Sequence, residues 1–316
     1  MFDSGGCVPS ASRCDHCPGS HTGELPCLAS ATVKARSWLL IEHPGPWPER
    51  IERLTGPAPV AAAVARALAA GVRPQLIRRP GRAGRRSVPP LQVYVGSSMP
   101  GGPVWLEGRR LSTLAELDKL DDDMLAAVAA GRRPEFGEPL SDEEPVVLVC
   151  THARRNVCCA RHGAPLARAL SARFGSLVWE TTHVGGDRYA ANLVCLPHGL
   201  YYGALGAAEA EAAVAAYLRG ELTLERLRGR AGLPEPAQAA EHFVRSRTGE
   251  LGVNAVSVES LTGTSPYEAV IDVSGARYRA IIERVEAAHE CGSDCSQNNG
   301  SWVVRGITLL NPAALV

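Results

Sequence analysis

Most of the information in this chain lies between Val146 and Gly203. The stretch reads VVLVCTHARRNVCC over residues 146–159 and, after a helical segment, VWETTHVGGDRYAANLVCLPHGLYYG over residues 178–203. Cys150 closes an apolar run, Cys159 follows a basic loop, and His183 opens a turn that contains two glycines. Two thiols and an imidazole on separate segments can converge in space. The stretch therefore predicts a metal or redox site.

The elements of this stretch follow the thioredoxin-like order. A strand, a helix and a second strand are followed by a two-stranded hairpin and a closing helix. We expect the strands at Val146–Val149, Leu177–Glu180, Ala190–Leu196 and Leu200–Gly203, and the helices at Pro165–Phe174 and Ala207–Leu218. The right-handed crossover rule leaves few other ways to pack this order.

The preceding part of the chain repeats the order. Its expected strands are Ser37–His43, Pro74–Ile77, Leu91–Val95 and Pro103–Glu107, and its expected helices are Val60–Ala70 and Leu114–Ala130. This block has nothing that matches Cys150, Cys159 or His183. We therefore predict an α/β protein in which a degenerate thioredoxin-like repeat precedes the thioredoxin-like domain that carries the site.

The rest of the chain is expected to form a small α+β unit. Residues 219–240 are charged and look helical apart from a proline break, and a further helix is expected at Pro236–Thr248. The expected strands are Asn254–Glu259, Tyr267–Asp272, Ala276–Ile282 and Ser301–Leu310. The predicted division is a Cys-rich N-terminal arm at 1–30, the degenerate block at 31–141, the thioredoxin-like domain that carries the site at 142–220 and the C-terminal extension at 221–316.

Composition limits the classes of function. The 316 residues carry 33 basic and 33 acidic side chains, so overall charge does not favour nucleic acid or an anionic membrane as a partner. No apolar run reaches the length of a membrane helix, and the polar N-terminus does not resemble a signal peptide. We expect a cytoplasmic protein, in which the ten cysteines are ligands, redox groups or buried residues more than a disulfide framework.

Six cysteines lie outside the central stretch and its neighbours, and their roles stay open. The N-terminal group could belong to a flexible arm or to a zinc site, and the C-terminal pair could form a disulfide, a second soft metal site or neither. These residues are Cys7, Cys14, Cys17, Cys27, Cys291 and Cys295. Cys195 lies inside an apolar strand and is expected in the core.

The residues around the central thiols suit metal or thiol chemistry. A cysteine at the end of a strand lies at the carboxyl edge of the sheet, where α/β sites form. His152 and two arginines of the following loop would stabilise a thiolate. Cys158 and Cys159 are adjacent, so one is expected to face the site; the plain alternative is that all three cysteines are small buried residues. Asp187 is either a ligand or a turn residue that caps the following segment or pairs with Arg188.

Two motifs carry a resemblance to a known family. They are C-T-H-x-x-R-N-x-x-C from Cys150 to Cys159 and H-V-G-G-x-R-Y-A-x-N from His183 to Asn192. Two further segments add to the resemblance, W-L-L-I-E-H-P-G-P-W at 38–47 and Q-A-A-E-H at 238–242. The chain resembles the sucrase/ferredoxin-like family, whose C-terminal part is a thioredoxin-like ferredoxin.

The resemblance implies a [2Fe-2S] cluster held by two cysteines and two histidines. Carried over, the cysteines fall on Cys150 and Cys159, the first histidine on His183, and the second on Asp187, where this chain departs from the pattern. Three outcomes follow for this chain: an aspartate ligand, another ligand such as Cys158 or His152, or loss of the cluster.

The leading function hypothesis is an electron-transfer protein that passes electrons to a protein redox partner, a carrier more than an enzyme with its own substrate. The first alternative is a thiol-disulfide oxidoreductase on the same fold, although the C-x-x-C spacing of thioredoxin is absent from the central site. The second alternative is a cluster-free or zinc-binding structural protein.

Overall fold

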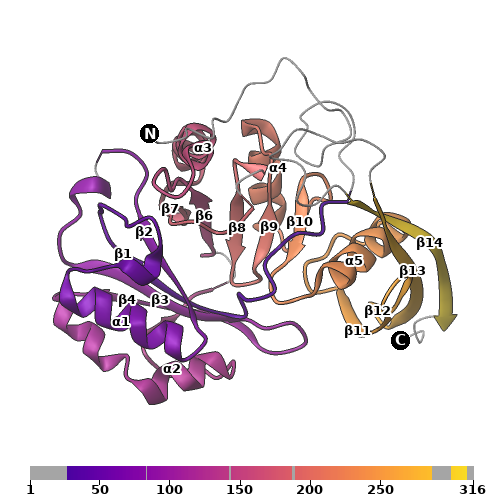
Figure 1. The fold of residues 1–316 in the computed structure, drawn as a ribbon, viewed down its shortest axis with the longest axis horizontal. Helices are drawn as coiled ribbons and strands as arrows, with labels where there is room; N and C mark the ends of the chain where they lie inside the picture. The colour runs from indigo at the N-terminus through magenta and orange to yellow at the C-terminus, as the bar shows by residue number, and fades with distance from the viewer. Residues whose placement is uncertain (1–26, 83, 142–143, 187–188, 287–299, 312–316) are drawn as a thin grey trace.

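Two β-sheets organise the chain. The computed structural model describes residues 27–82, 84–141, 144–186, 189–286 and 300–311. The larger sheet has ten strands in the order β10-β9-β8-β6-β7-β2-β1-β3-β4-β5, and the smaller has four in the order β11-β12-β13-β14. In Figure 1 the larger sheet runs across the molecule and the smaller lies beside the C-terminus.

The first half of the large sheet has the thioredoxin-like strand order β2-β1-β3-β4. Strands β1 and β2 are parallel, and β3 and β4 follow as antiparallel neighbours. The elements of this half are β1 Ser37–Glu42, η1 Ile51–Arg53, α1 Ala58–Ala69, β2 Arg73–Arg78, η2 Gly84–Arg86, β3 Leu91–Ser98, β4 Val104–Leu111, η3 Leu114–Lys119, α2 Asp122–Ala129 and β5 Glu138–Pro139.

The second half repeats this order as β7-β6-β8-β9, with the same parallel and antiparallel relations. Its elements are β6 Val146–Cys150, α3 Val157–Phe174, η4 Gly175–Leu177, β7 Val178–Thr181, β8 Leu193–Leu196, β9 Leu200–Tyr202, α4 Ala207–Tyr217 and β10 Leu227–Arg230. The predicted thioredoxin-like α/β fold is confirmed. The domain boundaries given above stay a prediction.

The halves join edge to edge through β2 and β7. These strands are antiparallel, and Arg78 lies opposite Glu180. The Arg78 Nε donates to Glu180 Oε2 over 2.8 Å, and its guanidinium lies 3.9 Å from the centre of the Trp47 ring. The Thr151 hydroxyl donates to the same carboxylate oxygen over 3.2 Å. A buried ion pair thus ties the junction to the residue that follows Cys150.

Alternation along the strands sends side chains into two apolar layers. In β1, Leu39 and Ile41 pack with the helices of the first half, whereas Trp38 and Leu40 pack on the opposite face. In β6, Val147 and Val149 pack with α3 and α4, and Cys150 belongs to the opposite face. Successive side chains of a strand point to opposite faces of the sheet, so a sheet that is covered on both faces buries apolar side chains on each of them.

Two helix predictions were wrong in their limits. The segment expected as one helix at Leu114–Ala130 is η3 followed by α2, because the carboxylate of Asp121 accepts from the Met124 N–H over 2.8 Å and starts a new helix there. Helix α3 begins at Val157 and not at Pro165, because the Asn156 side chain caps the Cys158 N–H over 2.8 Å. The first turn of α3 therefore carries both adjacent cysteines.

The helical prediction for residues 219–240 was also wrong in part. Residues Leu227–Arg230 form β10, which pairs with β9 and extends the large sheet. The segment was expected to be helical, but Arg228 lies in a strand and its side chain is buried and hydrogen-bonded.

The C-terminal unit is α+β, as predicted. Helix α5 packs on the antiparallel small sheet, and its Val244 lies in one apolar cluster with Ile271 and Ile282. Its elements are α5 Glu235–Thr248, β11 Val256–Gly263, β12 Tyr267–Val273, β13 Ala276–Glu286 and β14 Gly300–Asn311.

Candidate metal centre

Cys150, Cys159 and His183 converge at one end of the second half. Their ligand atoms all lie within 4.8 Å of one another. The Cys159 Sγ lies 3.8 Å from Nδ1 of His183. Both thiols are buried, each residue being 1% exposed, whereas His183 is half-buried. The three residues that the sequence analysis singled out thus form one donor group, open to solvent on the imidazole side.

Strand geometry brings two of these residues together. Strands β6 and β7 are parallel, and Cys150 lies opposite Thr181 at their carboxyl ends. The segments that leave these ends therefore emerge at the same edge of the sheet, where α/β proteins build their sites. His183 is reached two residues beyond β7.

Helix α3 supplies the third residue through a close approach to β6. A Cβ atom added at Gly163 would lie 2.0 Å from the Cys150 carbonyl oxygen, so only glycine allows this contact. Cys159 lies one turn earlier on the same helix and faces the same strand end. The sequence analysis missed Gly163, although a glycine inside a helix is a signal for close packing.

The surroundings favour the thiolate form of Cys150. Hydrogen bonding from the Cys159 side chain is the largest influence and holds the pKa of Cys150 well below its usual range, although burial acts in the opposite direction. Hydrogen bonds from His183 and from the backbone of His152 lower this pKa further. A thiolate is the form that binds metal or attacks a disulfide.

His152 positions His183. Its Nδ1 accepts the His183 backbone N–H over 3.1 Å, so the ring proton is on Nε2, which donates to the Pro48 carbonyl over 2.8 Å. Burial lowers the pKa of His152, which keeps the ring neutral as these bonds require. With both ring nitrogens engaged, His152 does not serve as the replacement ligand that was considered for it.

Of the adjacent cysteines, Cys159 belongs to the donor group. Cys158 is disulfide-bonded and so offers no free thiol.

The glycine turn after His183 is clamped from β10. Gly185 and Gly186 have φ values of +97° and +72°, which disfavour any side chain. Nη1 of Arg228 donates to the Gly185 carbonyl over 3.0 Å and to Asn192 Oδ1 over 2.7 Å, and Asn192 Nδ2 donates to the Gly186 carbonyl over 2.8 Å. Both polar side chains are buried. The sequence analysis missed Arg228 because its segment was expected to be helical.

Asp187 lies outside the described residues, as does Arg188, so its role as a ligand stays a prediction. The same holds for the cysteines at positions 7, 14, 17, 291 and 295. Cys27 is described and lies in the C-terminal core, where burial raises its pKa to about 12. Cys195 lies in the core of the second half, as predicted, and burial raises its pKa.

Comparison of the sequence with models of protein families relates this chain to known proteins. The model of the sucrase/ferredoxin-like family matches residues 28–229. The chain belongs to the sucrase/ferredoxin-like family. The match spans both thioredoxin-like halves and includes Arg228, but it ends before the C-terminal unit.

Comparisons with curated proteins and with solved structures found no match. Among the helices of the described residues, none has both the length and the apolar character needed to cross a membrane.

Proposed function

We propose that this sucrase/ferredoxin-like protein carries single electrons on a [2Fe-2S] cluster bound by Cys150, Cys159 and His183, with Asp187 as the fourth donor. The observation that carries the proposal is the convergence of two buried thiols and an imidazole within 4.8 Å. Thiolate and imidazole are the donors that iron-sulfur and zinc sites use. We propose a cytoplasmic location and a protein redox partner.

Cys150, Cys159 and His183 would bind the cluster, and neighbouring residues such as His152 would hold these ligands in position. When bound, such a cluster supplies reversible one-electron chemistry. Cys150, with its lowered pKa, is suited to bind iron as a thiolate, and burial of both cysteines excludes water from that side. The half-buried His183 leaves the imidazole side accessible, and this is where a partner would approach.

The proposal is tested on full-length protein purified without oxygen. We expect visible charge-transfer absorption, with iron and acid-labile sulfide in equal amounts, and bleaching by dithionite. Cys150→Ser and Cys159→Ser should each abolish the colour. Cys195→Ser is the matched control, because Cys195 is equally buried but lies in the core of the second half. A wild-type protein that contains no iron under these conditions refutes the proposal.

A thiol-disulfide oxidoreductase is the second candidate, and one observation favours it. Cys159 lowers the pKa of Cys150 through a hydrogen bond, which is how a reactive thiol is activated. The same purification separates the candidates. A colourless, metal-free protein with one rapidly alkylated thiol supports this second function, and a colourless protein that contains zinc supports a structural site.

Asp187 is tested by restoring the family's residue. Replacing an anionic ligand by a neutral imidazole makes the site less negative, which raises the reduction potential and couples it to protonation. Asp187→His should therefore raise the midpoint potential and make it more dependent on pH. An unchanged potential would mean that Asp187 is not a ligand.

A further inference from the structure

A cavity lies away from the metal centre, between the two halves. Its volume is about 620 Å³. Val146, the first residue of β6, lines this cavity, whereas Cys150, the last residue of the same strand, belongs to the metal centre. The two sites thus lie at opposite ends of one strand. The first half contributes residues of β3 and β4, and the second contributes Ser176 and Leu177.

Two arginines give the cavity a cationic side. The Arg79 guanidinium lies 3.5 Å from the centre of the Trp179 ring and donates to the Ser176 carbonyl, so its position is fixed. Arg110, on β4, is exposed at the rim. Burial is the main influence that lowers the pKa of Arg79; Tyr94 and Glu42 act in the opposite direction, and the like charge of Arg110 lowers this pKa to a smaller extent. An anion between these two groups would relieve their repulsion.

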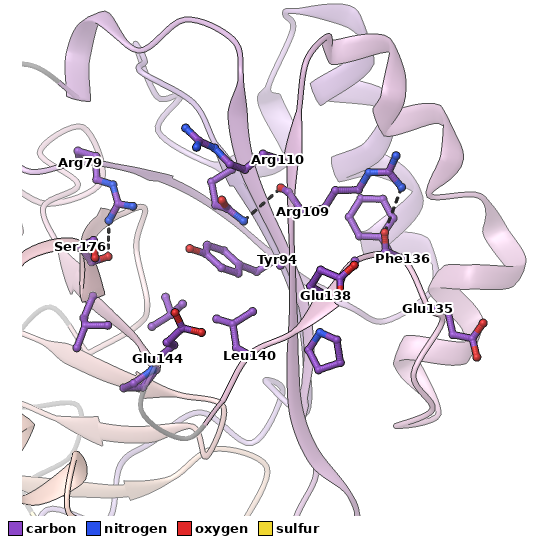
Figure 2. A pocket seen from close by; sticks show the side chains of 17 residues that line it. Arg79, Tyr94, Arg109, Arg110, Glu135, Phe136, Glu138, Leu140, Glu144 and Ser176 are labelled. Carbon is purple, nitrogen blue, oxygen red and sulfur yellow. Dashed lines mark hydrogen bonds between the residues drawn. The ribbon is translucent and has the colours of Figure 1, made fainter.

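The other charged residues limit what this side can accept. Arg109 is already engaged, because its Nη2 lies 3.3 Å from Glu116 Oε2 and its Nη1 donates to the Phe136 carbonyl over 3.2 Å. Three glutamates, Glu135, Glu138 and Glu144, also line the cavity. In Figure 2 Arg79 and Arg110 lie on the side of the cavity away from Glu144. The cationic part is therefore small, which suits one acid group and disfavours an extended polyanion.

The centre of the cavity is aromatic and apolar. Figure 2 shows the Tyr94 ring projecting into it, with Leu140 below the ring. Tyr94 is 8% exposed, and burial raises its pKa to about 12, so the hydroxyl stays protonated and can donate a hydrogen bond. Val146 and Leu177 extend the apolar lining. A ligand with a flat apolar body would bury that body against these side chains.

We propose that this cavity binds a small organic anion, a carboxylate or phosphate monoester on an aromatic or apolar body. The acid group lies between Arg79 and Arg110 and accepts from the Tyr94 hydroxyl, and the body packs on Tyr94 and Leu140. The site is independent of the metal centre, so its test does not depend on the cluster.

Calorimetric titration of the full-length protein with phenyl phosphate tests the site, because this probe carries both an acid group and a ring. Saturable binding is expected at millimolar concentration or below and should weaken as salt is raised. Inorganic phosphate lacks the ring and benzyl alcohol lacks the charge. Each should bind at least about tenfold more weakly, since each loses one of the two contributions.

Variants locate the binding. Arg110→Gln removes an exposed charge and should weaken phenyl phosphate binding about tenfold, the usual loss for one charge-assisted hydrogen bond. Arg168→Gln is the matched control, an exposed arginine on α3 outside the cavity, and should bind like the wild type. Tyr94→Phe keeps the ring and should lose several-fold in affinity.

Three outcomes would overturn the proposal. They are no saturable binding of phenyl phosphate, equal affinity in Arg110→Gln and Arg168→Gln, or binding of inorganic phosphate as tight as that of phenyl phosphate.

Discussion

The contact between Gly163 and the end of β6 makes a sharp prediction about the metal centre. Replacing Gly163 by alanine adds one methyl group where helix α3 passes the Cys150 carbonyl. The added Cβ would lie 2.0 Å from that oxygen, whereas real Cβ atoms keep at least 3.0 Å, so α3 and β6 must separate by at least the difference. The obstacle is backbone, which cannot rotate away as a side chain can.

The cost follows from two opposing contributions. Overpacking of a buried contact costs about 1–3 kcal/mol, and a clash with backbone belongs at the upper end of that range. Alanine inside a helix is more favourable than glycine by about 1 kcal/mol. We therefore expect Gly163→Ala to lose about 2 kcal/mol of unfolding free energy. Because Cys159 moves with α3, its Sγ should also shift away from Cys150 by more than the ~0.2 Å that a metal site tolerates.

Denaturant unfolding and metal content measure the two effects. The control is Gly306→Ala in β14, where an added Cβ meets nothing within 4 Å, and its stability should stay within about 0.5 kcal/mol of the wild type. A Gly163→Ala protein with unchanged stability and metal content would refute the close approach. Lost stability with full metal content would refute the link between α3 and the donor group.

Two further predictions concern buried charged residues, Arg228 and Glu241. Arg228→Met removes the donor to the Gly185 carbonyl and to the Asn192 side chain, which should lower the free energy of unfolding by about 3 kcal/mol. Because the glycine turn follows His183, the variant should also contain less metal. Denaturant unfolding and iron analysis measure the two effects, and a variant as stable as the wild type would contradict the role of Arg228 as a clamp. Burial raises the pKa of Glu241, but ion pairs with Arg230 and Arg245 outweigh burial and leave the pKa below its usual value. This carboxylate therefore stabilises the fold above the unfolded pKa of about 4.3, and the stabilisation is lost as pH falls through the lower folded value. Unfolding measured between neutral and acid pH should show a shallower loss of stability in Glu241→Gln than in the wild type, and identical slopes would contradict the assignment.

Local patterns were sufficient for most of the elements and for two members of the donor group, Cys150 and His183. The apolar run before Cys150 and the glycine turn after His183 each act within a few residues. Once the β-α-β order is known, the carboxyl ends of parallel strands must meet at one edge of the sheet. That is why Cys150 and His183 could be selected from the sequence, whereas the family resemblance favoured Cys159 over the adjacent Cys158. The repeated order upstream predicted the first half in the same way.

One prediction failed because it depends on residues far apart in the chain, and another because two local signals competed. Sequence alone does not distinguish Arg228 on an exposed helix from Arg228 buried in β10, because the acceptors that make burial tolerable come from Ser30, Gly185 and Asn192. The start of α3 was misplaced because proline is a strong local signal for a helix start, whereas the cap that Asn156 provides is a weaker one.

The sequence by itself determined which side chains could bind a metal and which strands would present them, since periodicity and motif spacing are local properties. Tertiary structure alone decided how the two halves share one sheet through β2 and β7, how closely α3 approaches Cys150, and which buried groups hold His183 in place. Edge pairing brings Arg78 to Glu180 across 102 residues, and a buried hydrogen bond brings His152 to His183 across 31, and no local pattern encodes which residues those partners are.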